Sequence, residues 1–191
     1  MIPSHPALDR LGDALDRAAG PILPTLARLV FAAVLLVYYM NAGLAKLGEG
    51  ALGFLRPELG AYAAIFPRAM EAVSYDVSQL GLWHWLVTFS GAWAEILLPL
   101  LILAGLFTRL AALGMIGVVV IQSATDVLGH GVGGADLGRF FDIASGAAIL
   151  DQRALWIFVL LVLVMKGGGP LALDRLAFRN APSARPVSRP L

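Results

Sequence analysis

Four long apolar segments, separated by polar and glycine-rich stretches, dominate the pattern of residues along this chain. They cover residues of about 26–47, 82–104, 109–128 and 153–171. A helix rises about 1.5 Å per residue, so about 20 apolar residues cross a hydrocarbon core of about 30 Å. The pattern therefore predicts an all-α fold, a polytopic membrane four-helix bundle over residues 26–173.

The chain before the first span has a different pattern. In residues 1–25, three leucines recur at spacings of three and four between charged positions. This pattern is typical of an amphipathic helix that lies in the membrane interface. Pro21 and Pro24 follow, and they predict a hinge before the first span. A mobile tail is the alternative for this segment.

The remaining segments outside the spans predict interfacial helices, loops and a tail. Residues 48–81 contain many glycines and an apolar run that is too short to span, so we expect one or two short surface helices. Residues 129–138 form a glycine-rich stretch without the spacing of a dinucleotide-binding motif, which predicts a loop. Residues 174–191 combine arginines with prolines and predict a disordered basic tail.

Composition narrows the function classes. The chain is 59% hydrophobic and 14% charged, whereas soluble domains carry about 25% charged residues. A net charge of +1 argues against a nucleic-acid partner. Because there is no cysteine, the chain has no dithiol, iron–sulfur or thiolate–zinc site of its own. The three histidines match no ligand spacing, so no metal site is predicted.

Basic residues indicate how the bundle is oriented. The side with the N-terminus, the 105–109 turn and the C-terminus holds nine of the 14 Lys and Arg residues. The other side holds five, spread over longer loops. Cytoplasmic segments carry an excess of Lys and Arg, so we predict that both termini are cytoplasmic.

Glu95 lies near the middle of the second span and is the main candidate for function. A carboxyl group at that depth costs roughly 2.5–3.5 kcal/mol on insertion scales, so it should face a partner or water. Gly91, Thr88 and His84 precede it at helical spacing. This stripe of small and polar residues is suited to a packed interface or a buried site rather than to lipid.

Polar residues from three spans could meet at the outer side of Glu95. Lys46 ends the first span, and its long side chain could reach the Glu95 carboxylate. We predict an outward-facing polar pocket lined by Asn41, Lys46, His84, Glu95, Gln122 and Asp126. In this hypothesis Glu95 relays a proton or binds a quinone, and the others, with Thr88, bind substrate.

Each candidate residue also has a structural interpretation. Lys46, Asp126 and His84 are compatible with ordinary positions in the membrane interface, as are Tyr38 and Tyr39 near the end of the first span. Gln122 can hydrogen-bond a neighbouring helix. Glu95 can form a purely structural pair with Lys46 or with Arg109.

Several short motifs resemble the DoxX-like membrane proteins. The first span closes on Gly43, Lys46 and Leu47 in the pattern Gly-x-x-Lys-Leu, and the second carries Glu95. A Gly-x-x-Thr-Arg turn follows at Gly105, Thr108 and Arg109, and the last span ends in Gly167–Gly169 and then Ala172, Leu173 and Asp174. The resemblance extends over residues 28–176. Ala172 stands where the family pattern has Ser.

The resemblance implies a four-helix protein of the bacterial inner membrane. Some such proteins are linked to quinone-dependent oxidoreductases, including thiosulfate:quinone oxidoreductase, or to complexes that handle oxidative stress. The leading hypothesis is a membrane subunit that holds a quinone near Glu95, with a protein partner or a homo-oligomer completing the system. A scaffold or assembly factor and a transport helper for a small solute or metal are the alternatives.

Overall fold

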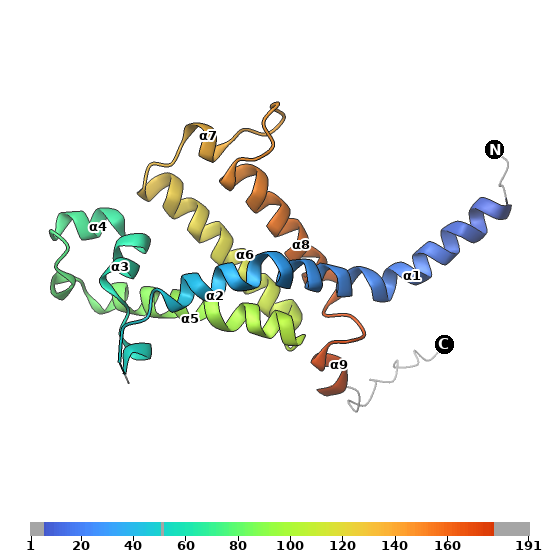
Figure 1. The fold of residues 1–191 in the computed structure, drawn as a ribbon, viewed down its shortest axis with the longest axis horizontal. Coiled ribbons are helices and arrows are strands. Elements are labelled where there is room, and N and C mark those ends of the chain that lie inside the picture. The colour runs from blue at the N-terminus through green and yellow to red at the C-terminus, as the bar shows by residue number, and fades with distance from the viewer. Residues whose placement is uncertain (1–5, 51, 178–191) are drawn as a thin grey trace, which may run out of the picture.

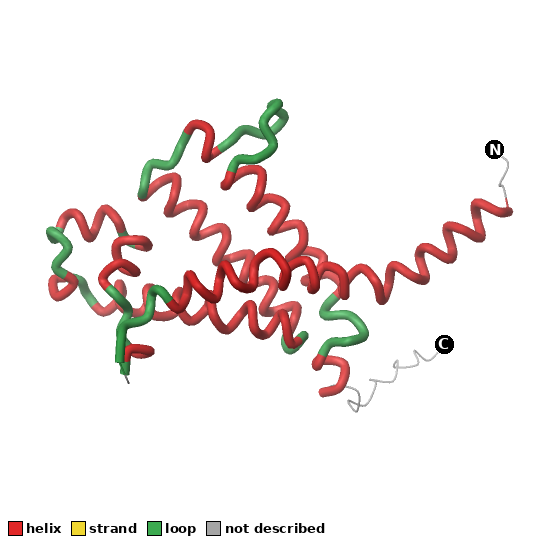
Figure 2. The backbone as a smooth tube through the Cα atoms, in the orientation of Figure 1, coloured by secondary structure: helices red, strands yellow, loops and turns green. Residues whose placement is uncertain are grey.

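Four long helices form a bundle, and short helices and loops connect them (Figure 1). The computed structural model describes residues 6–50 and 52–177. In the described part of the chain every regular element is a helix (Figure 2), which confirms the predicted all-α fold. The first long helix consists of α1 (Pro6–Phe31), the π-helix η1 (Ala32–Leu36) and α2 (Val37–Leu44), and the second is α5 (Leu82–Ala104). The third consists of α6 (Thr108–Ala124) and the π-helix η4 (Thr125–Gly129). The fourth consists of the π-helix η5 (Ala148–Gln152) and α8 (Arg153–Lys166).

These four helices are long and apolar enough to cross a membrane. The candidate spans are Ala7–Leu44, Leu82–Ala104, Thr108–Gly129 and Ala148–Lys166. The second and third agree with the predicted 82–104 and 109–128. The fourth begins and ends about five residues earlier than the predicted 153–171, because the helix starts in η5 and stops at the glycines after Lys166.

The first helix differs most from the sequence prediction. It is a continuous helix through Pro21 and Pro24, so the chain does not leave the helical conformation there, although α1 changes direction between the bundle and its N-terminal half (Figure 1). Both prolines lie in the helix interior, and Thr25 donates a hydrogen bond to the Pro21 carbonyl at 2.8 Å. Over 38 residues the helix is about 57 Å long, longer than a bilayer core. Its N-terminal half therefore projects beyond the bundle (Figure 1).

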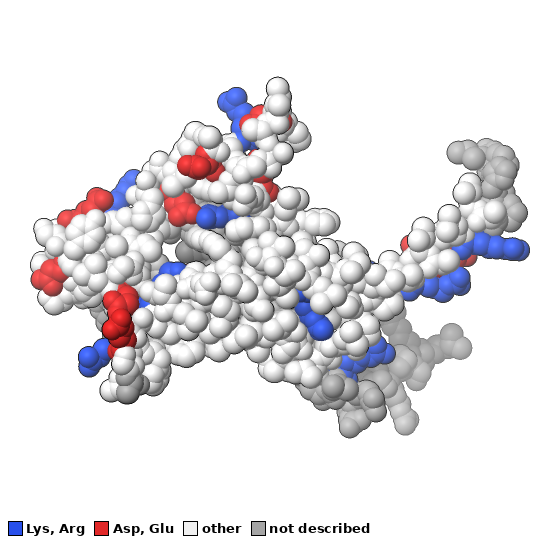
Figure 3. Space-filling view, viewed as in Figure 1, with Lys and Arg blue, Asp and Glu red and all other residues white. Residues whose placement is uncertain are grey.

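The core of the bundle forms where the four helices meet. α6 packs against α5 and α8, α1 packs against α8, and α2 packs against α5. The buried hydrophobic residues at this centre are Ala27, Phe31, Leu35, Tyr39, Ile102, Ala111, Ala112, Met115, Val119, Leu160 and Leu163. The outward faces of the spans remain apolar (Figure 3), as expected for surfaces that face lipid.

Short helices gather at the end of the bundle where α2 ends and α5 begins, here called the α3 end. They are η2 (Gly53–Leu55), α3 (Leu59–Ile65), α4 (Pro67–Ala72), η3 (Val77–Gln79) and α7 (Gly134–Leu137). The predicted short surface helices of 48–81 are thus present. Asp76 accepts hydrogen bonds from Ser78 and Gln79, and these bonds lower the pKa of Asp76 below its usual value.

The opposite end of the bundle, here called the α9 end, carries the turn between α5 and α6 and the loop after α8. That loop leads to α9 (Leu173–Ala177). The sequence predicts a disordered tail from residue 174, but the first residues of that segment are helical. The rest of the predicted tail, 178–191, lies outside the described residues, as do residues 1–5 of the N-terminal segment.

A close approach between α2 and α5 occurs at Gly43. A Cβ atom at this position would lie 2.6 Å from Ile96 Cγ1 and 2.9 Å from the Ala92 carbonyl oxygen. The missing side chain therefore lets the two helix backbones come together, as small residues do in membrane interfaces. This contact lies within one turn of Lys46 and directly opposite Glu95.

We predict that Gly43→Ala destabilises the protein by about 1–3 kcal/mol, because the Ala92 backbone cannot move aside easily. The measurement is the midpoint of thermal unfolding of the detergent-solubilised protein. Gly117→Ala is the matched control, because a Cβ at Gly117 has no atom within 4 Å and alanine favours a helix by up to about 1 kcal/mol. Equal midpoints for the two variants would contradict the close packing at Gly43.

Candidate functional site

A cavity of about 500 Å³ lies between α5 and α6 at the α3 end. Small residues on both helices, Gly91 and Ala94 on α5 and Gly114 and Gly117 on α6, leave the space open. The other lining residues are Lys46, Ala64, Ile65, Val87, Ser90, Glu95, Leu98, Val118, Ile121, Gln122, Thr125, Asp126 and His130. The volume is in the usual range for small-molecule sites.

The cavity opens on the outside of the bundle. Its lining residues Ser90, Gly117 and Ile121 are exposed, and all three lie on membrane-spanning helices. An opening at this position faces the lipid. A hydrophobic molecule dissolved in the bilayer can therefore reach the cavity sideways.

An ion pair forms the inner wall of the cavity. Lys46 Nζ lies 2.5 Å from Glu95 Oε2 and also donates to the Ala42 carbonyl at 3.2 Å. The side chains keep only 17% and 10% of their accessible surface. The predicted contact between Lys46 and Glu95 is thus present. Arg109, the alternative partner, lies at the α9 end.

Gln122 lines the cavity and also contacts two tyrosines of α2. It donates to the Tyr38 hydroxyl at 2.9 Å and accepts a longer bond from the Tyr39 hydroxyl at 3.5 Å. Tyr39 is fully buried, whereas the sequence predicts an interfacial position for it. Both tyrosine rings contact Trp156 of α8. The amide of Gln122 is therefore oriented by two tyrosines of α2, whose rings pack in turn against α8.

A second ion pair lies at the rim of the cavity near the α3 end. Arg153 donates to Asp126 at 2.6 Å and to the Ser123 hydroxyl at 3.0 Å. Asp126 lies in the π-helix η4, and Arg153 directly follows the π-helix η5. His130, also at this rim, is within 3.0 Å of the Ala64 carbonyl, so the cavity is bounded by α3 as well.

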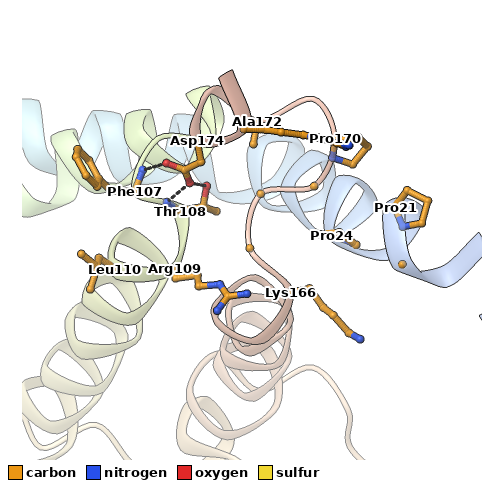
Figure 4. Close-up of a pocket in the computed structure, with 15 residues that line it drawn as sticks. Pro21, Pro24, Phe107, Thr108, Arg109, Leu110, Lys166, Pro170, Ala172 and Asp174 are labelled. Carbon is orange, nitrogen blue, oxygen red and sulfur yellow. Dashed lines mark hydrogen bonds between the residues drawn. The ribbon is translucent and has the colours of Figure 1, made fainter. Parts of the chain in front are cut away.

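Hydrogen bonds between Asp174 and the start of α6, here called the Asp174 clasp, connect two distant segments at the α9 end (Figure 4). The Asp174 carboxylate accepts from the backbone N–H groups of Phe107 and Thr108 at 2.6 and 2.9 Å, and from the Thr108 hydroxyl at 2.9 Å. It therefore caps the N-terminus of α6 from a distant segment. Arg28 of α1 donates to the carbonyls of Gly168 and Leu171 and fixes the loop before α9.

Two of the short motifs noted in the sequence have a structural role: Glu95 pairs with Lys46, and Thr108 binds Asp174 at the start of α6. The sequence model of the DoxX family matches residues 23–125, more than half of the chain. The chain belongs to the DoxX family. No curated protein and no solved structure matches it. In this DoxX protein the matched region includes Lys46, Glu95 and Gln122 of the cavity, whereas Arg153 and Asp174 lie beyond it.

The DoxX cavity contains four of the seven predicted site residues. Lys46, Glu95, Gln122 and Asp126 line it. The remaining three do not. Asn41 is exposed on α2. Gly43, two residues later and so on nearly the opposite face of the helix, is the residue that contacts α5.

His84 and Thr88 lie on α5 but outside the cavity lining. Thr88 is fully buried, and its hydroxyl has no hydrogen-bond partner in the described part of the chain. The His84 ring packs edge-on against Phe66 with centroids 4.8 Å apart. The residues of the polar stripe on α5 therefore have different surroundings. Gly91 and Glu95 line the cavity, whereas His84 packs against Phe66, between α3 and α4, and Thr88 is buried.

Sequence reasoning did not select His130, which lines the cavity, or Arg153, which binds Asp126 and Ser123 at its rim. Arg153 could have been found from its charge, because it starts the fourth span on the same side as Asp126 at the end of the third. His130 carried no such signal. Within residues 6–50 and 52–177, no group of three or more His, Cys, Asp or Glu residues is arranged to hold a metal ion.

We predict that Lys46 and Glu95 are energetically coupled. Lys46→Met and Glu95→Gln should each cost about 3 kcal/mol, because each leaves a buried partner unpaired. The double variant should lose about 1–3 kcal/mol less than the sum of the single losses. Thermal unfolding of the four proteins in detergent measures this cycle, and strictly additive losses would mean that the pair contributes nothing.

We also predict that Asp174→Ala lowers stability by about 1–2 kcal/mol, because it removes the cap of α6. Asp142→Ala removes an exposed loop carboxylate and is the control, with an expected change within about 0.5 kcal/mol. Both are measured by thermal unfolding in the same detergent. Equal effects in the two variants would show that the clasp is not needed for stability.

Proposed function

We propose that this DoxX protein is a membrane subunit of a quinone-linked oxidoreductase or redox-stress complex. Its role is to hold a quinone in the cavity between α5 and α6. The observation that carries the proposal is an opening toward lipid that leads to a Lys–Glu pair at membrane depth. Ionisable groups at that depth are costly and are functional by default.

The chemistry of the lining suits an amphipathic ligand with a carbonyl head. Most lining residues are apolar or small, and polar side chains from α5, from α6 and from the segment after α2 lie among them. The Lys46 ammonium can donate to a carbonyl oxygen, and Glu95 keeps that ammonium in place. Gln122 offers a second polar contact, oriented by Tyr38. Such sites are usually apolar with a few polar groups that fix orientation.

A bound quinone supplies the capacity to accept two electrons and two protons. The residues of the chain bind its head, exclude bulk water and provide a carboxylate that can receive or release a proton. Since the chain has no cysteine and therefore no dithiol or thiolate-held cluster, electrons are delivered by a partner protein. We place the protein in the bacterial inner membrane with both termini in the cytoplasm.

A scaffold or assembly role is the second candidate, and the Lys46–Glu95 pair itself favours it. The two groups satisfy each other at 2.5 Å, as in a contact that only holds helices together. This role requires the pair for stability and does not require a ligand in the cavity. Transport of a small solute or metal is a third possibility, which uptake into proteoliposomes tests.

We predict that native mass spectrometry of the detergent-solubilised protein detects one bound short-chain ubiquinone or menaquinone analogue. Gly117→Leu should abolish the adduct, because the leucine side chain occupies the cavity. Glu95→Gln should weaken binding at least about tenfold, because it releases Lys46 from its position. The added quinone analogues are the probes, and wild-type protein without them gives the baseline.

Gly12→Leu is the matched control for the steric variant. It adds the same side chain on α1, where a Cβ has no atom within 4 Å, and should retain the adduct. Binding that persists in Gly117→Leu would place the quinone outside this cavity. No adduct in the wild type, together with a stability loss in Glu95→Gln, would favour the scaffold.

A further inference from the structure

A second cavity, of about 610 Å³, lies at the α9 end of the bundle. It is bounded by α1, by the N-terminus of α6 and by the loop after α8 (Figure 4). Its walls combine apolar groups, such as Pro21, Pro24 and Leu110, with the glycines 167–169. The proposed quinone site is at the other end of the bundle and does not use these residues.

Three basic side chains surround this cavity without acidic partners. Arg109, Lys166 and Arg175 line it and are exposed. None of them forms an ion pair in the described part of the chain, although all 13 Asp and Glu residues lie there. The cavity therefore has an uncompensated positive charge.

The single acidic residue of the lining does not cancel this charge. Asp174 has both carboxylate oxygens engaged by the N-terminus of α6 and the Thr108 hydroxyl. The interaction offsets its negative charge with the positive end of the helix dipole. Figure 4 shows Asp174 turned toward the start of α6, while Arg109 is directed toward the end of α8.

The loop that forms the floor of the cavity is held in place. Arg28 donates to the Gly168 and Leu171 carbonyls, so it is used for structure and is not free for a ligand. Gly169 has a positive φ of 79°, and a Cβ there would lie 2.7 Å from the Thr25 hydroxyl oxygen. Gly169 thus allows the loop to lie close against α1.

The depth of the cavity selects the kind of ligand. α5 ends at Ala104, α6 begins at Thr108 and α8 ends at Lys166, so the cavity lies where three spans leave the hydrocarbon core. Phosphate groups of lipids occupy this level, and basic pockets between membrane helices bind anionic headgroups. The apolar walls suit the upper part of an acyl chain or another hydrophobic group attached to the phosphate.

We propose that this cavity is a binding site for a phosphate group, recognised by Arg109, Lys166 and Arg175. The phosphate belongs either to an anionic phospholipid or to a soluble phosphate. Arg109 contributes a planar set of donors suited to phosphate oxygens, and Lys166 contributes a flexible charge at the end of its helix.

The test compares ligand effects on thermal unfolding of the detergent-solubilised protein. Short-chain phosphatidylglycerol should raise the midpoint more than phosphatidylcholine with the same acyl chains. In Arg109→Gln/Lys166→Gln the affinity for phosphatidylglycerol should fall roughly thirtyfold, since each basic group near an anionic lipid contributes about one factor of five. Inorganic phosphate, added alone, tests the soluble source.

The control removes the same charge from the other end of the bundle. Arg68→Gln/Arg139→Gln should keep the wild-type response. This result would show that the lipid binds at the α9 end and is not attracted to the protein by its overall positive charge. A response to inorganic phosphate that the first double variant loses supports the site with a soluble ligand. The proposal is overturned if the wild type responds to neither probe, or if both double variants lose the response equally.

Discussion

The carboxylate of Glu95 at membrane depth is the constraint on which the arrangement of the bundle depends. A charge in that position needs a cation within reach, and the nearest one is on another helix. Lys46, two residues after the end of α2, provides it, and its ammonium lies between the Glu95 carboxylate and the Ala42 carbonyl. Gly43 allows the necessary backbone approach. The ion pair between Lys46 and Glu95 therefore depends on the close packing of α2 and α5 at Gly43.

The two ends of the bundle are built by different means. At the α9 end, Asp174 of α9 accepts hydrogen bonds from the start of α6, and Arg28 of α1 donates to the loop before α9. At the α3 end, the π-helical segments η4 and η5 stand on either side of the pair between Asp126 and Arg153. π-helical turns are frequent at functional sites. Here they bring opposite charges from adjacent spans together at the rim of the cavity.

Hydropathy and spacing predict the four membrane-spanning helices, because the preference of a long apolar segment for the membrane depends on its own residues and not on its neighbours in the fold. They also identified Lys46 and Glu95, since a buried charge requires a partner and few were available. They did not predict that α1 continues through Pro21 and Pro24. Membrane helices tolerate proline when neighbouring groups satisfy the freed backbone, and this depends on packing rather than on local sequence.

The sequence also does not predict which neighbouring helix each side chain faces. Asn41 is close to Lys46 along the chain but is exposed on another face, and Thr88 is buried outside the cavity. Tyr39 is a fully buried contact of Gln122, one helical turn before the close approach of α2 to α5 at Gly43. The rotation of a helix is decided by its neighbours. Lys46 follows α2, Glu95 lies on α5 and Gln122 lies on α6, so the packing of three helices, rather than spacing along the chain, brings these polar residues to one cavity.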